Sequence, residues 1–469
     1  MADNSHNNDF SGYHSEWNLG SPGGWYYQLL AQQLGRFIWD RIRRVTGLSL
    51  ALDFDHPILS APPGLRDMLL SAHSCRWGRS EAPGIAILAE EDTLDVVVEN
   101  RLMVEYLCKE PGVKAVLAAP AELEKTPGGE YRISDTRITV AFCDFNNAIV
   151  AQLADEHKAG ALLDAVSDNI TVNPRGMEPV GSKGIFEAVT GPLGKSLSAE
   201  TVRRTPWTRR FYPRKTEGPD GARIADLVEW TRNNWKSLVL KPEHGFSGKG
   251  VFVGYSLDDA DKCIQTALDH GEYIVQQMIP VALWSEKYPE AGTDRGNPVL
   301  RVRQTDFRCL ISDNGLFGIL SRYGGIPTNV GSGGGTQSVA VIDGSAGDAA
   351  ALVCDAMEKM PGTEFDELSE EVGRRALSLG LGYLDGPIPQ AMRPRIISLG
   401  QLTALKRFSR GLWQDCVKLE KCWREGNLDR FLTLPEKEKS IASRQAWNGS
   451  PALLASDGLY SFGADLVDG

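Results

Sequence analysis

Six short strand-like runs follow one another between residues 236 and 342, and they constrain the fold more than any other feature of the chain. The runs are rich in β-branched and aliphatic residues, with glycine turns between several of them: KSLVLKP, GVFVGY, YIVQQMI, FRCLIS, FGILSR and SVAVI. Strands joined by short glycine turns pair side by side in opposite directions. We therefore expect a mostly antiparallel sheet in this part of the chain.

The part of the chain before residue 200 shows a different pattern. The apolar runs GIAILAE, VKAVLAAP and ITVAFC alternate with helical segments at 95–109 and 146–155, which is typical of βαβ units. Apolar residues at helical spacing also predict a long helix over 24–46. These patterns predict a doubly wound α/β domain with a parallel sheet, and the proline-rich, basic stretch 205–220 places its boundary near residue 200.

The last third of the chain is predicted to be mainly helical. Apolar residues recur at helical spacing from 347 to about 432. After the turn residues Ser456, Asp457 and Gly458, the alternating run 459–467 predicts a final strand. At roughly 150 residues per domain, the 469 residues suffice for about three packed units.

Composition narrows the choice of partners. The chain has 50 basic and 61 acidic residues and a net charge of −11, which argues against general attraction to nucleic acid or to an anionic membrane. No apolar run reaches the roughly 18–20 residues of a membrane span, and the start of the chain lacks the features of a secretory leader. We therefore expect a cytoplasmic protein with small-molecule substrates. The sequence is also compatible with a homodimer.

The segment 237–255, SLVLKPEHGFSGKGVFVGY, holds the strongest local signal for chemistry. Lys241 ends a β-rich run, and a loop with three glycines follows: Gly245, Gly248 and Gly250. Glycine lets backbone amides approach phosphate oxygens, and the lysine can neutralise their charge. The loop is not a Walker A motif, which would need glycine at Glu243 and serine or threonine at Gly250. Taken alone, it is also compatible with a flexible hairpin turn.

Further polar residues stand on the strand-like runs that follow. EYIVQQMIP at 272–280 ends in Gln276 and Gln277, where backbone groups are available for an adenine edge. In TDFRCLI, Arg308 alternates with apolar neighbours, so its side chain is expected on the opposite face of the sheet. A guanidinium there suits a phosphoryl group in transfer. Arg322, Asn329 and the run Gly333, Gly334, Gly335 come next.

The order of these motifs resembles that of the ATP-grasp superfamily of carboxylate–amine ligases. DFRCLI, the basic strand after it and TNVGSGGG resemble the central subdomain of that family, and LKP with its glycine loop resembles the hairpin that covers the triphosphate. Upstream, TVNPRGMEPVGSKGIFEAV at 171–189 is similar to the segment whose lysine, here Lys183, reaches the nucleotide. The resemblance covers roughly residues 165–342.

The metal ligands of ordinary members are missing after the glycine run. Glutathionylspermidine-synthase-like and circularly permuted members carry a Glu-x-Asn pair upstream instead, and YHSEWNLGSPGGW resembles that segment. Glu16 and Asn18 are two residues apart, so both side chains face the same side of a strand, where their oxygens can meet one hard cation. An isolated motif of this kind would more often be a polar edge strand.

The aspartate that would complete the metal site has two candidates, Asp9 and Asp465. Asp465 is preferred, because the run LYSFGADLV around it is the better strand. This choice predicts that 459–467 pairs antiparallel with about 11–18, so that the two ends of the chain are neighbours.

A stretch of basic and aromatic residues at 203–215 offers a competing interpretation. Such a mixture can hold nucleic acid through phosphate contacts and base stacking. On a chain with net negative charge, a solvated connector or a patch for an anionic substrate is preferred.

The resemblance implies an α/β fold in which a doubly wound pre-ATP-grasp domain precedes an ATP-grasp core of two α+β subdomains, with permuted termini and a helical C-terminal segment. It divides the chain into a metal-site strand at 1–20, the pre-ATP-grasp domain at 21–200, the nucleotide-binding subdomains at 201–345, the helical segment at 346–455 and a returning strand at 456–469. The implied activity is ATP-dependent ligation of a small carboxylate to an amine through an acyl phosphate, with release of ADP and phosphate. Kinase-like phosphoryl transfer and a non-catalytic nucleotide- or RNA-binding role are the alternatives.

The resemblance also implies a set of site residues. Those expected to hold ATP are Lys183, Lys241, Gly245, Ser247, Gly248, Lys249, Gly250, Gln276, Gln277, Met278, Ile279 and Asn329. Mg²⁺ is expected at Glu16, Asn18 and Asp465. Arg308 and Arg322 are expected to stabilise charge on the γ-phosphoryl group and the acyl phosphate.

Overall fold

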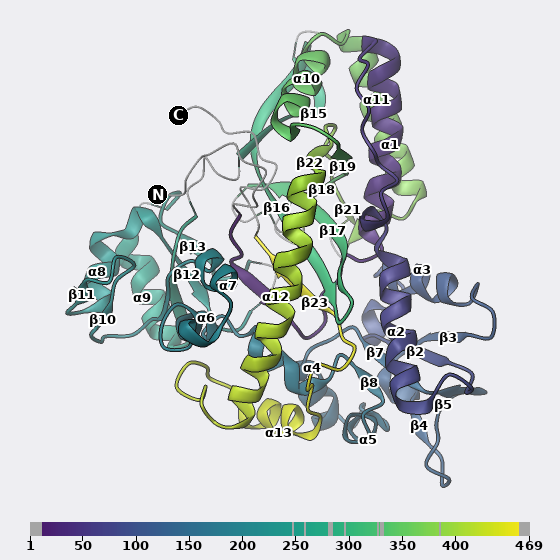
Figure 1. Ribbon diagram of the computed structural model, residues 1–469, viewed down its shortest axis with the longest axis vertical. Coiled ribbons are helices and arrows are strands. Elements are labelled where there is room, and N and C mark those ends of the chain that lie inside the picture. The colour runs from purple at the N-terminus through teal and green to yellow at the C-terminus, as the bar shows by residue number, and fades with distance from the viewer. Residues whose placement is uncertain are drawn as a thin grey trace.

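The computed structural model is a mixed α/β structure with several sheets (Figure 1). It describes residues 12–245, 248–257, 259–279, 285–294, 297–325, 328, 333–383 and 386–458. No helix within these ranges is long and apolar enough to cross a bilayer.

An antiparallel sheet runs through the centre of the molecule. Its strand order is β1-β23-β16-β17-β18, and β15 also pairs with β16; the bounds are Glu16–Asn18, Leu454–Asp457, Asn297–Ser312, Gly315–Gly324, Gly335–Gln337 and, for β15, Ser285–Asp294. All these pairings are antiparallel, as the closely spaced runs predicted. The sheet therefore joins segments from both ends and the middle of the chain.

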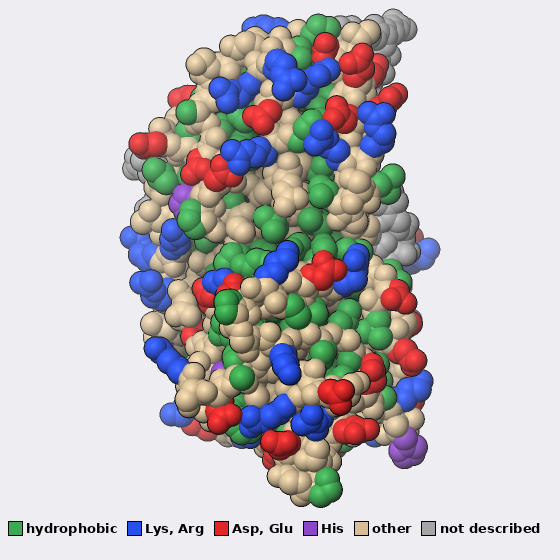
Figure 2. Space-filling model, turned by 90° about the vertical axis from the view of Figure 1, so that its right-hand side faces the viewer, with side chains coloured by type: hydrophobic (Ala, Val, Ile, Leu, Met, Phe, Trp, Pro, Cys, Tyr) green, Lys and Arg blue, Asp and Glu red, His purple; other side chains and the backbone are tan. Residues whose placement is uncertain are grey.

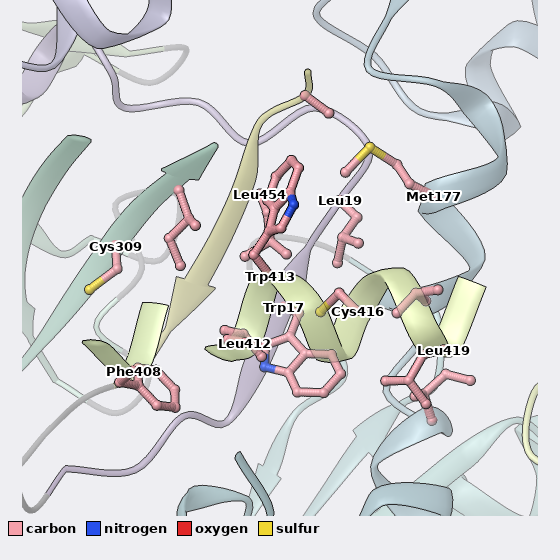
Figure 3. Close-up of a cluster of buried hydrophobic side chains, with 14 of the residues drawn as sticks. Trp17, Leu19, Met177, Cys309, Phe408, Leu412, Trp413, Cys416, Leu419 and Leu454 are labelled. Atoms are coloured by element: carbon pink, nitrogen blue, oxygen red, sulfur yellow. The ribbon is translucent and has the colours of Figure 1, made fainter. Parts of the chain in front are cut away.

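The long helix α12 (Leu399–Arg424) covers one face of this sheet (Figure 1). Its apolar residues recur three or four apart and are buried against inward-facing side chains of the strands (Figure 3). The cluster includes Trp17, Leu19, Phe307, Cys309, Phe408, Leu412, Cys416, Leu419 and Leu454. Because alternate strand residues fill this core, the residues between them face the other side of the sheet.

The two ends of the chain pair, as expected, while the predicted strand 459–467 lies outside the described residues. Within the described residues the partner of β1 is Leu454–Asp457, with Glu16 opposite Asp457 and Asn18 opposite Ala455. Ser-Asp-Gly has the composition of a turn, yet Ser456 and Asp457 lie in the strand, because β1 and β16 pair with β23 on its two sides. The chain leaves the extended conformation at Gly458, whose φ is +94°.

A parallel sheet lies in the first part of the chain, as predicted. Its strand order is β3-β2-β7-β8, with bounds Lys114–Ala118, Gly84–Leu88, Val140–Cys143 and Thr171–Val172. Helices α2 (Ala61–Trp77), α3 (Val98–Leu107) and α4 (Asn147–Asp155) accompany this sheet, whereas the predicted long helix, α1 (Tyr27–Thr46), contacts β17 and β18 of the central sheet. From β2 the chain first adds β3 on one side and later β7 on the other, so the winding reverses between β2 and β7.

A third sheet carries the glycine-loop hairpin. Its order is β13-β12-β14-β9, with bounds Phe252–Val253, Leu238–Pro242, Tyr273–Gln277 and Thr208–Arg210. Helices α8 (Leu227–Asn233) and α9 (Ala260–His270) contribute to its core. Its strands pair antiparallel, again as predicted.

The C-terminal third is not helical throughout. Helices α10 (Ala346–Glu358), α11 (Gly362–Ser378) and α12 agree with the helical pattern predicted for 347 to about 432, and α13 (Glu436–Arg444) lies beyond it; β22 (Arg395–Ser398) interrupts the helices between α11 and α12. It pairs parallel with β19 (Val339–Ile342), which the antiparallel prediction did not foresee. Ile396 and Ile397 are fully buried, so the short run RIIS is stabilised by packing on both faces.

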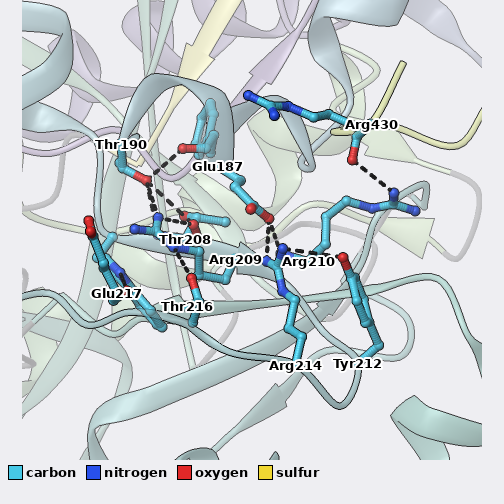
Figure 4. A network of polar contacts seen from close by, with 12 residues as sticks. Glu187, Thr190, Thr208, Arg209, Arg210, Tyr212, Arg214, Thr216, Glu217 and Arg430 are labelled. Carbon is cyan, nitrogen blue, oxygen red and sulfur yellow. Dashed lines mark hydrogen bonds and ion pairs between the residues drawn. The ribbon is translucent and has the colours of Figure 1, made fainter. Parts of the chain in front are cut away.

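Of the two interpretations preferred for the basic and aromatic stretch, a solvated connector or a patch for an anionic substrate, the structure disagrees with the solvated connector. Arg209 donates to the hydroxyls of Thr190 and Thr216, and the guanidinium of Arg214 lies 2.6 Å from a carboxylate oxygen of Glu187 (Figure 4). Arg210 donates to the carbonyl of Arg430. These guanidinium groups connect β9 to helix α6 (Ile185–Val189) and to the C-terminal segment. On the face drawn in Figure 2, basic and acidic side chains are interspersed.

Candidate active site

A cavity of about 650 Å³ lies where the three sheets approach one another. Strands of the central sheet, the glycine-loop hairpin and the loops that follow β2 and β7 all contribute to its wall. Most of the predicted site residues within the described ranges line it: Glu16, Asn18, Lys183, Lys241, Gly245, Gly248, Lys249, Gln276, Gln277, Met278, Ile279, Arg308 and Arg322. One cavity thus collects residues from both ends of the chain.

The central sheet presents a row of charged side chains to this cavity. Glu16 of β1 lies opposite Asp457 of β23, which lies opposite Arg308 of β16. The neighbours Trp17 and Phe307 are buried in the core on the other face. The alternation that predicted a common face for Glu16 and Asn18, and an opposite face for Arg308 and its apolar neighbours, is therefore confirmed.

Asp457 is the centre of this row. Arg308 donates to both of its oxygens, from Nε at 2.9 Å and from Nη2 at 2.7 Å, and Asn18 Nδ2 donates to Oδ2 at 3.0 Å. Nη2 of Arg322 lies 3.4 Å from the same oxygen. Burial alone would raise the pKa of Asp457, but Arg308 and Arg322 outweigh it and hold the pKa below the ordinary value. The carboxylate therefore stays ionised at neutral pH.

A second ion pair lies on the same face of the central sheet, two residues before Arg308 on β16. Arg322 on β17 is directly opposite Asp306 on β16, and its Nε donates to Oδ1 at 2.9 Å. Asp306 is 2% and Arg322 7% exposed. Such a bidentate pair fixes the guanidinium, so Arg322 is held beside Asp457 before any ligand arrives.

Two lysines face the row from the other side. Lys183 Nζ lies 3.7 Å from a carboxylate oxygen of Glu16 and donates to the carbonyl of Gly245 at 3.1 Å. Lys241 Nζ donates to Gln276 Oε1 at 2.8 Å. Burial lowers the pKa of Lys241 to about 8, against the opposing influence of Glu16, and Lys183 lowers it further. Two ammonium groups close to each other in a cavity form a site for an anion.

The glycine loop follows Lys241 as predicted. Gly245, Gly248 and Gly250 have φ values of +149°, +72° and +73°, conformations that side-chain-bearing residues rarely adopt. A Cβ on Gly250 would lie 2.8 Å from the Tyr273 hydroxyl oxygen. The glycines are therefore required by the backbone itself as well as by any approach to phosphate.

The expected adenine segment is already partly engaged. The backbone N–H of Gln277 donates to the carbonyl of Trp207 and that of Met278 to the carbonyl of Ser237, at 2.8 and 2.9 Å. Gln276 is buried between Lys241 and the hydroxyl of Thr208. Neither of these two N–H groups is free for an adenine edge, although all four residues of the segment 276–279 line the cavity.

Three predicted residues lie outside the described residues: Ser247, Asn329 and Asp465, as does the alternative Asp9. Several carboxylates that line the cavity were not predicted, among them Asp457 and Asp306 of the central sheet. Asp306 stands two residues before Arg308, so strand alternation alone would have placed it on the same face. Asp457 had a weaker signal in the alternating run LLASD, which the turn residues obscured.

Glu16, Asp457 and Asn18 fit a magnesium ion in the kind of ligand they supply. Mg²⁺ prefers oxygen ligands and commonly takes one or two carboxylates, with waters and substrate phosphates completing its octahedron. Asp457 shares its oxygens with arginine, whereas the Glu16 carboxylate is 29% exposed. Within the described residues no group of three or more His, Cys, Asp or Glu side chains is arranged to hold a metal unaided. A metal here would accordingly depend on phosphate oxygens.

No protein-family model and no curated protein sequence matches this chain. Solved structures to which it is similar include a RimK domain ATP-grasp protein from Sphaerobacter thermophilus DSM 20745, at 20% identity over 50% of this chain and 71% of that one, with a TM-score of 0.29. The D-alanine–D-alanine ligase of Bacillus anthracis is 13% identical over 74% of this chain and 100% of its own, with a TM-score of 0.31.

The macrocyclase MdnC from Microcystis aeruginosa MRC, bound with the precursor peptide MdnA, is 11% identical over 62% of this chain and 84% of its own, with a TM-score of 0.30. The first of these neighbours is named as an ATP-grasp protein, and all three have low sequence identity to this chain. Because the TM-scores are low, the function proposed below rests on the residues of the cavity.

Proposed function

We propose that this chain is an ATP-dependent ligase that joins a carboxylate to an amine, with Mg²⁺ as cofactor and ADP and phosphate as products. The observation that carries the proposal is the single cavity in which two lysines and a glycine loop face the row Glu16, Asp457 and Arg308. Cations, backbone amides and hard oxygen ligands in one place are what a nucleoside triphosphate and its metal require. The pairing of the chain ends fits a permuted ATP-grasp core, with the divisions at 20, 200, 345 and 455 as its domain boundaries.

In this proposal Lys183, Lys241 and the amides of the loop 245–250 bind the β- and γ-phosphates. Bound Mg²⁺, held by Glu16 and Asp457, would neutralise phosphate charge. Arg308 and Arg322 lie in fixed positions beside the transferring group, where they stabilise negative charge that spreads over its oxygens. Catalysis then consists mainly of positioning and charge neutralisation.

The chemistry has two balanced steps. A carboxylate oxygen of the first substrate bonds to the γ-phosphorus while the bond to ADP breaks, which gives an acyl phosphate. The nitrogen of the amine then bonds to the acyl carbon, the bond to phosphate breaks, and the amine loses a proton. The product is an amide with inorganic phosphate.

Hydroxylamine allows a test without knowledge of the amine, since it converts an acyl phosphate into a stable hydroxamate. We expect the full chain, given ATP, Mg²⁺ and a pool of small carboxylates, to form hydroxamate together with ADP. Lys241→Met should abolish the product, whereas Lys262→Met, an exposed position on α9, should not. ADP without hydroxamate, formed only with hydroxyl acceptors, would indicate a kinase. Absence of ADP with every pool, despite nucleotide binding, would indicate a non-catalytic protein.

A further inference from the structure

One side of the cavity is lined by carboxyl groups that the proposed ligation does not use. They come from the loops after β2 and β7, from α3, from the segment before Lys183, and from α13: Glu90, Asp144, Glu99, Glu178 and Glu438. We call these five residues the acidic wall. The lysines and arginines that line the cavity, Lys183, Lys241, Lys249, Arg308 and Arg322, belong to the central sheet, the glycine-loop hairpin and the segment just before α6. The acidic and the basic groups of the cavity thus come from different structural elements.

The acidic wall differs from the other carboxylates of the cavity in having no cation within ion-pair distance; Arg308 acts on Glu99, and His244 on Glu438, only from farther away. Asp457 and Asp306 are paired with arginines, and Glu16 lies 3.7 Å from Lys183. Within the described residues, no ion pair of 4.0 Å or less involves any member of the acidic wall. The guanidinium of Arg175, near Glu178, donates instead to the carbonyls of Asn173 and Phe145.

The position of the wall in the fold is that of a ligand site. Glu90 and Asp144 follow the carboxyl ends of β2 and β7, the two strands between which the winding of the parallel sheet reverses. In open α/β sheets, ligands bind in the crevice outside this reversal. The cavity extends into that crevice, since residues 144–149 line it.

A second observation points to a ligand that donates hydrogen bonds. The side-chain carbonyl oxygens of Asn100 and Asn147 are buried and have no partner within the described residues, and both side chains are at most 2% exposed. Asn147 lines the cavity and its backbone N–H donates to Glu178, and Asn100 donates its amide to Asp144, so both asparagines contact members of the acidic wall. Buried polar atoms are normally paired, and these two unpaired atoms are both acceptors.

We propose that the acidic wall binds a primary ammonium group on an alkyl stem, as found on a lysine side chain or an alkyl diamine, and so selects a positively charged substrate. The inference rests on the proposed ligase function, in which this substrate takes part while ATP occupies the opposite side of the cavity. An ammonium group supplies one positive charge and three donors, which complements carboxylates and amide oxygens alike.

The electrostatic state of the free wall agrees with this assignment. Burial raises the pKa of Asp144 to about 7 despite its hydrogen bond from Asn100, and Glu99 and Glu90 raise it further. Burial likewise raises the pKa of Glu178 to about 7. A cation would relieve both effects, because it favours the ionised carboxylates.

Binding to the full chain can be measured by calorimetry with two matched probes, Nα-acetyl-lysine amide and Nα-acetyl-norleucine amide, in the presence of Mg²⁺ and a non-hydrolysable ATP analogue. We expect the lysine probe to bind at least about tenfold more tightly, since only its ammonium distinguishes it. The triple variant Glu90→Gln, Asp144→Asn, Glu438→Gln should remove that preference and leave binding of the ATP analogue unchanged. Glu99 is kept, because it accepts from the backbone N–H groups of Gly24 and Tyr26 at the start of α1.

The matched control is Glu91→Gln with Glu436→Gln, which removes two exposed carboxylates from neighbouring positions outside the cavity wall and should retain the preference for the lysine probe.

A further arm with 1,4-diaminobutane distinguishes a free diamine from a lysine side chain by which of the two binds more tightly. Equal binding of the two amides by the unmodified chain, or a preference that survives in the triple variant, would overturn the inference. If either of these results is obtained while the ATP analogue still binds, only the ammonium site is contradicted and the proposed ligase function stands. If the lysine probe is preferred but the ATP analogue does not bind, the proposed ligase function is contradicted instead.

Discussion

The central sheet and the glycine-loop sheet present charge to the cavity in opposite ways. On the central sheet Asp457 is paired with Arg308 and Arg322, and Arg322 also with Asp306. On the glycine-loop sheet Lys241 donates to neutral groups, the side-chain oxygen of Gln276 and the carbonyl of Ser15. The charges on the central sheet are neutralised by ion pairs within the protein, whereas the ammonium group of Lys241 has no bonded carboxylate.

This difference indicates different roles. Paired charges hold each other in one geometry, which suits the positioning of a reacting group. A buried ammonium without a bonded carboxylate is in an unfavourable state, as the lowered pKa of Lys241 shows, and an arriving phosphate improves it. The central sheet is therefore organised before ligand binding, whereas the glycine-loop sheet gains its counter-charge from the ligand.

The largest effect on stability and activity is expected when the ion pairs of the central sheet are broken. Asp457→Asn would leave Arg308 and Arg322 buried with one carboxylate fewer, and breaking a buried ion pair costs about 3–5 kcal/mol. We expect the free energy of unfolding to fall by about 3 kcal/mol or more in urea titrations, and ATP turnover to fall by orders of magnitude. Asp343→Asn, at an exposed aspartate, is the matched control. Unchanged stability in Asp457→Asn would show that the charges of the central sheet do not depend on their ion pairs, and would contradict the difference between the two sheets.

The ammonium group of Lys241 should change its protonation when an ATP analogue binds, and this change can be measured as proton uptake. The pKa of Lys241 is about 8 in the free protein, so part of the population is neutral at pH 8.5. Bound phosphate favours the charged form and raises the pKa, so binding of an ATP analogue should take up protons at pH 8–9 and take up fewer near pH 6.5. Calorimetry in buffers of different ionisation enthalpy measures this uptake. We expect Lys241→Met to remove most of it; uptake of equal size in the variant would assign the proton to another group.

A smaller effect is expected at the glycine loop. Gly250→Ala puts a Cβ 2.8 Å from the Tyr273 hydroxyl oxygen at a φ of +73°, which should lower stability by roughly 1 kcal/mol and weaken binding of the ATP analogue several-fold. Gly347→Ala, where a Cβ meets nothing within 4 Å and φ is not positive, is the control. Thermal unfolding and calorimetry check both values. Equal behaviour of the two variants would contradict the requirement for glycine at 250.

Local patterns in the sequence were sufficient for residues whose position depends on their own strand. The alternation around Glu16, Asn18 and Arg308 predicted their faces correctly, because side-chain direction in a strand follows from the backbone alone. Lys241 and the glycines were found for the same reason, since the hairpin is a short-range structure.

Other parts of the site depend on which distant segments pair, and no local pattern specifies that. Asp457 reads as a turn residue until β1 and β16 hold it in a strand. The acidic wall combines residues from 90 to 438, and only the topology of the parallel sheet brings them together. A partial signal was present, because the polar residues that follow GIAIL and VAFC mark the carboxyl ends of parallel strands.

The smallest effect is expected from deletion of residues 460–469, and it decides which aspartate completes the metal site. The sequence favoured Asp465, in which case this deletion abolishes magnesium-dependent activity. The described structure places Asp457 opposite Glu16, and the deletion leaves β23 and its pairing with β1 intact. We therefore expect ATP turnover and its magnesium dependence to stay within about twofold of the full chain. Deletion of residues 454–469 is the matched comparison: it removes β23 from between β1 and β16, and with it the counter-charge of Arg308, and should abolish activity. Loss of activity in the shorter deletion would return the metal site to Asp465 and leave Asp457 as the structural partner of two arginines.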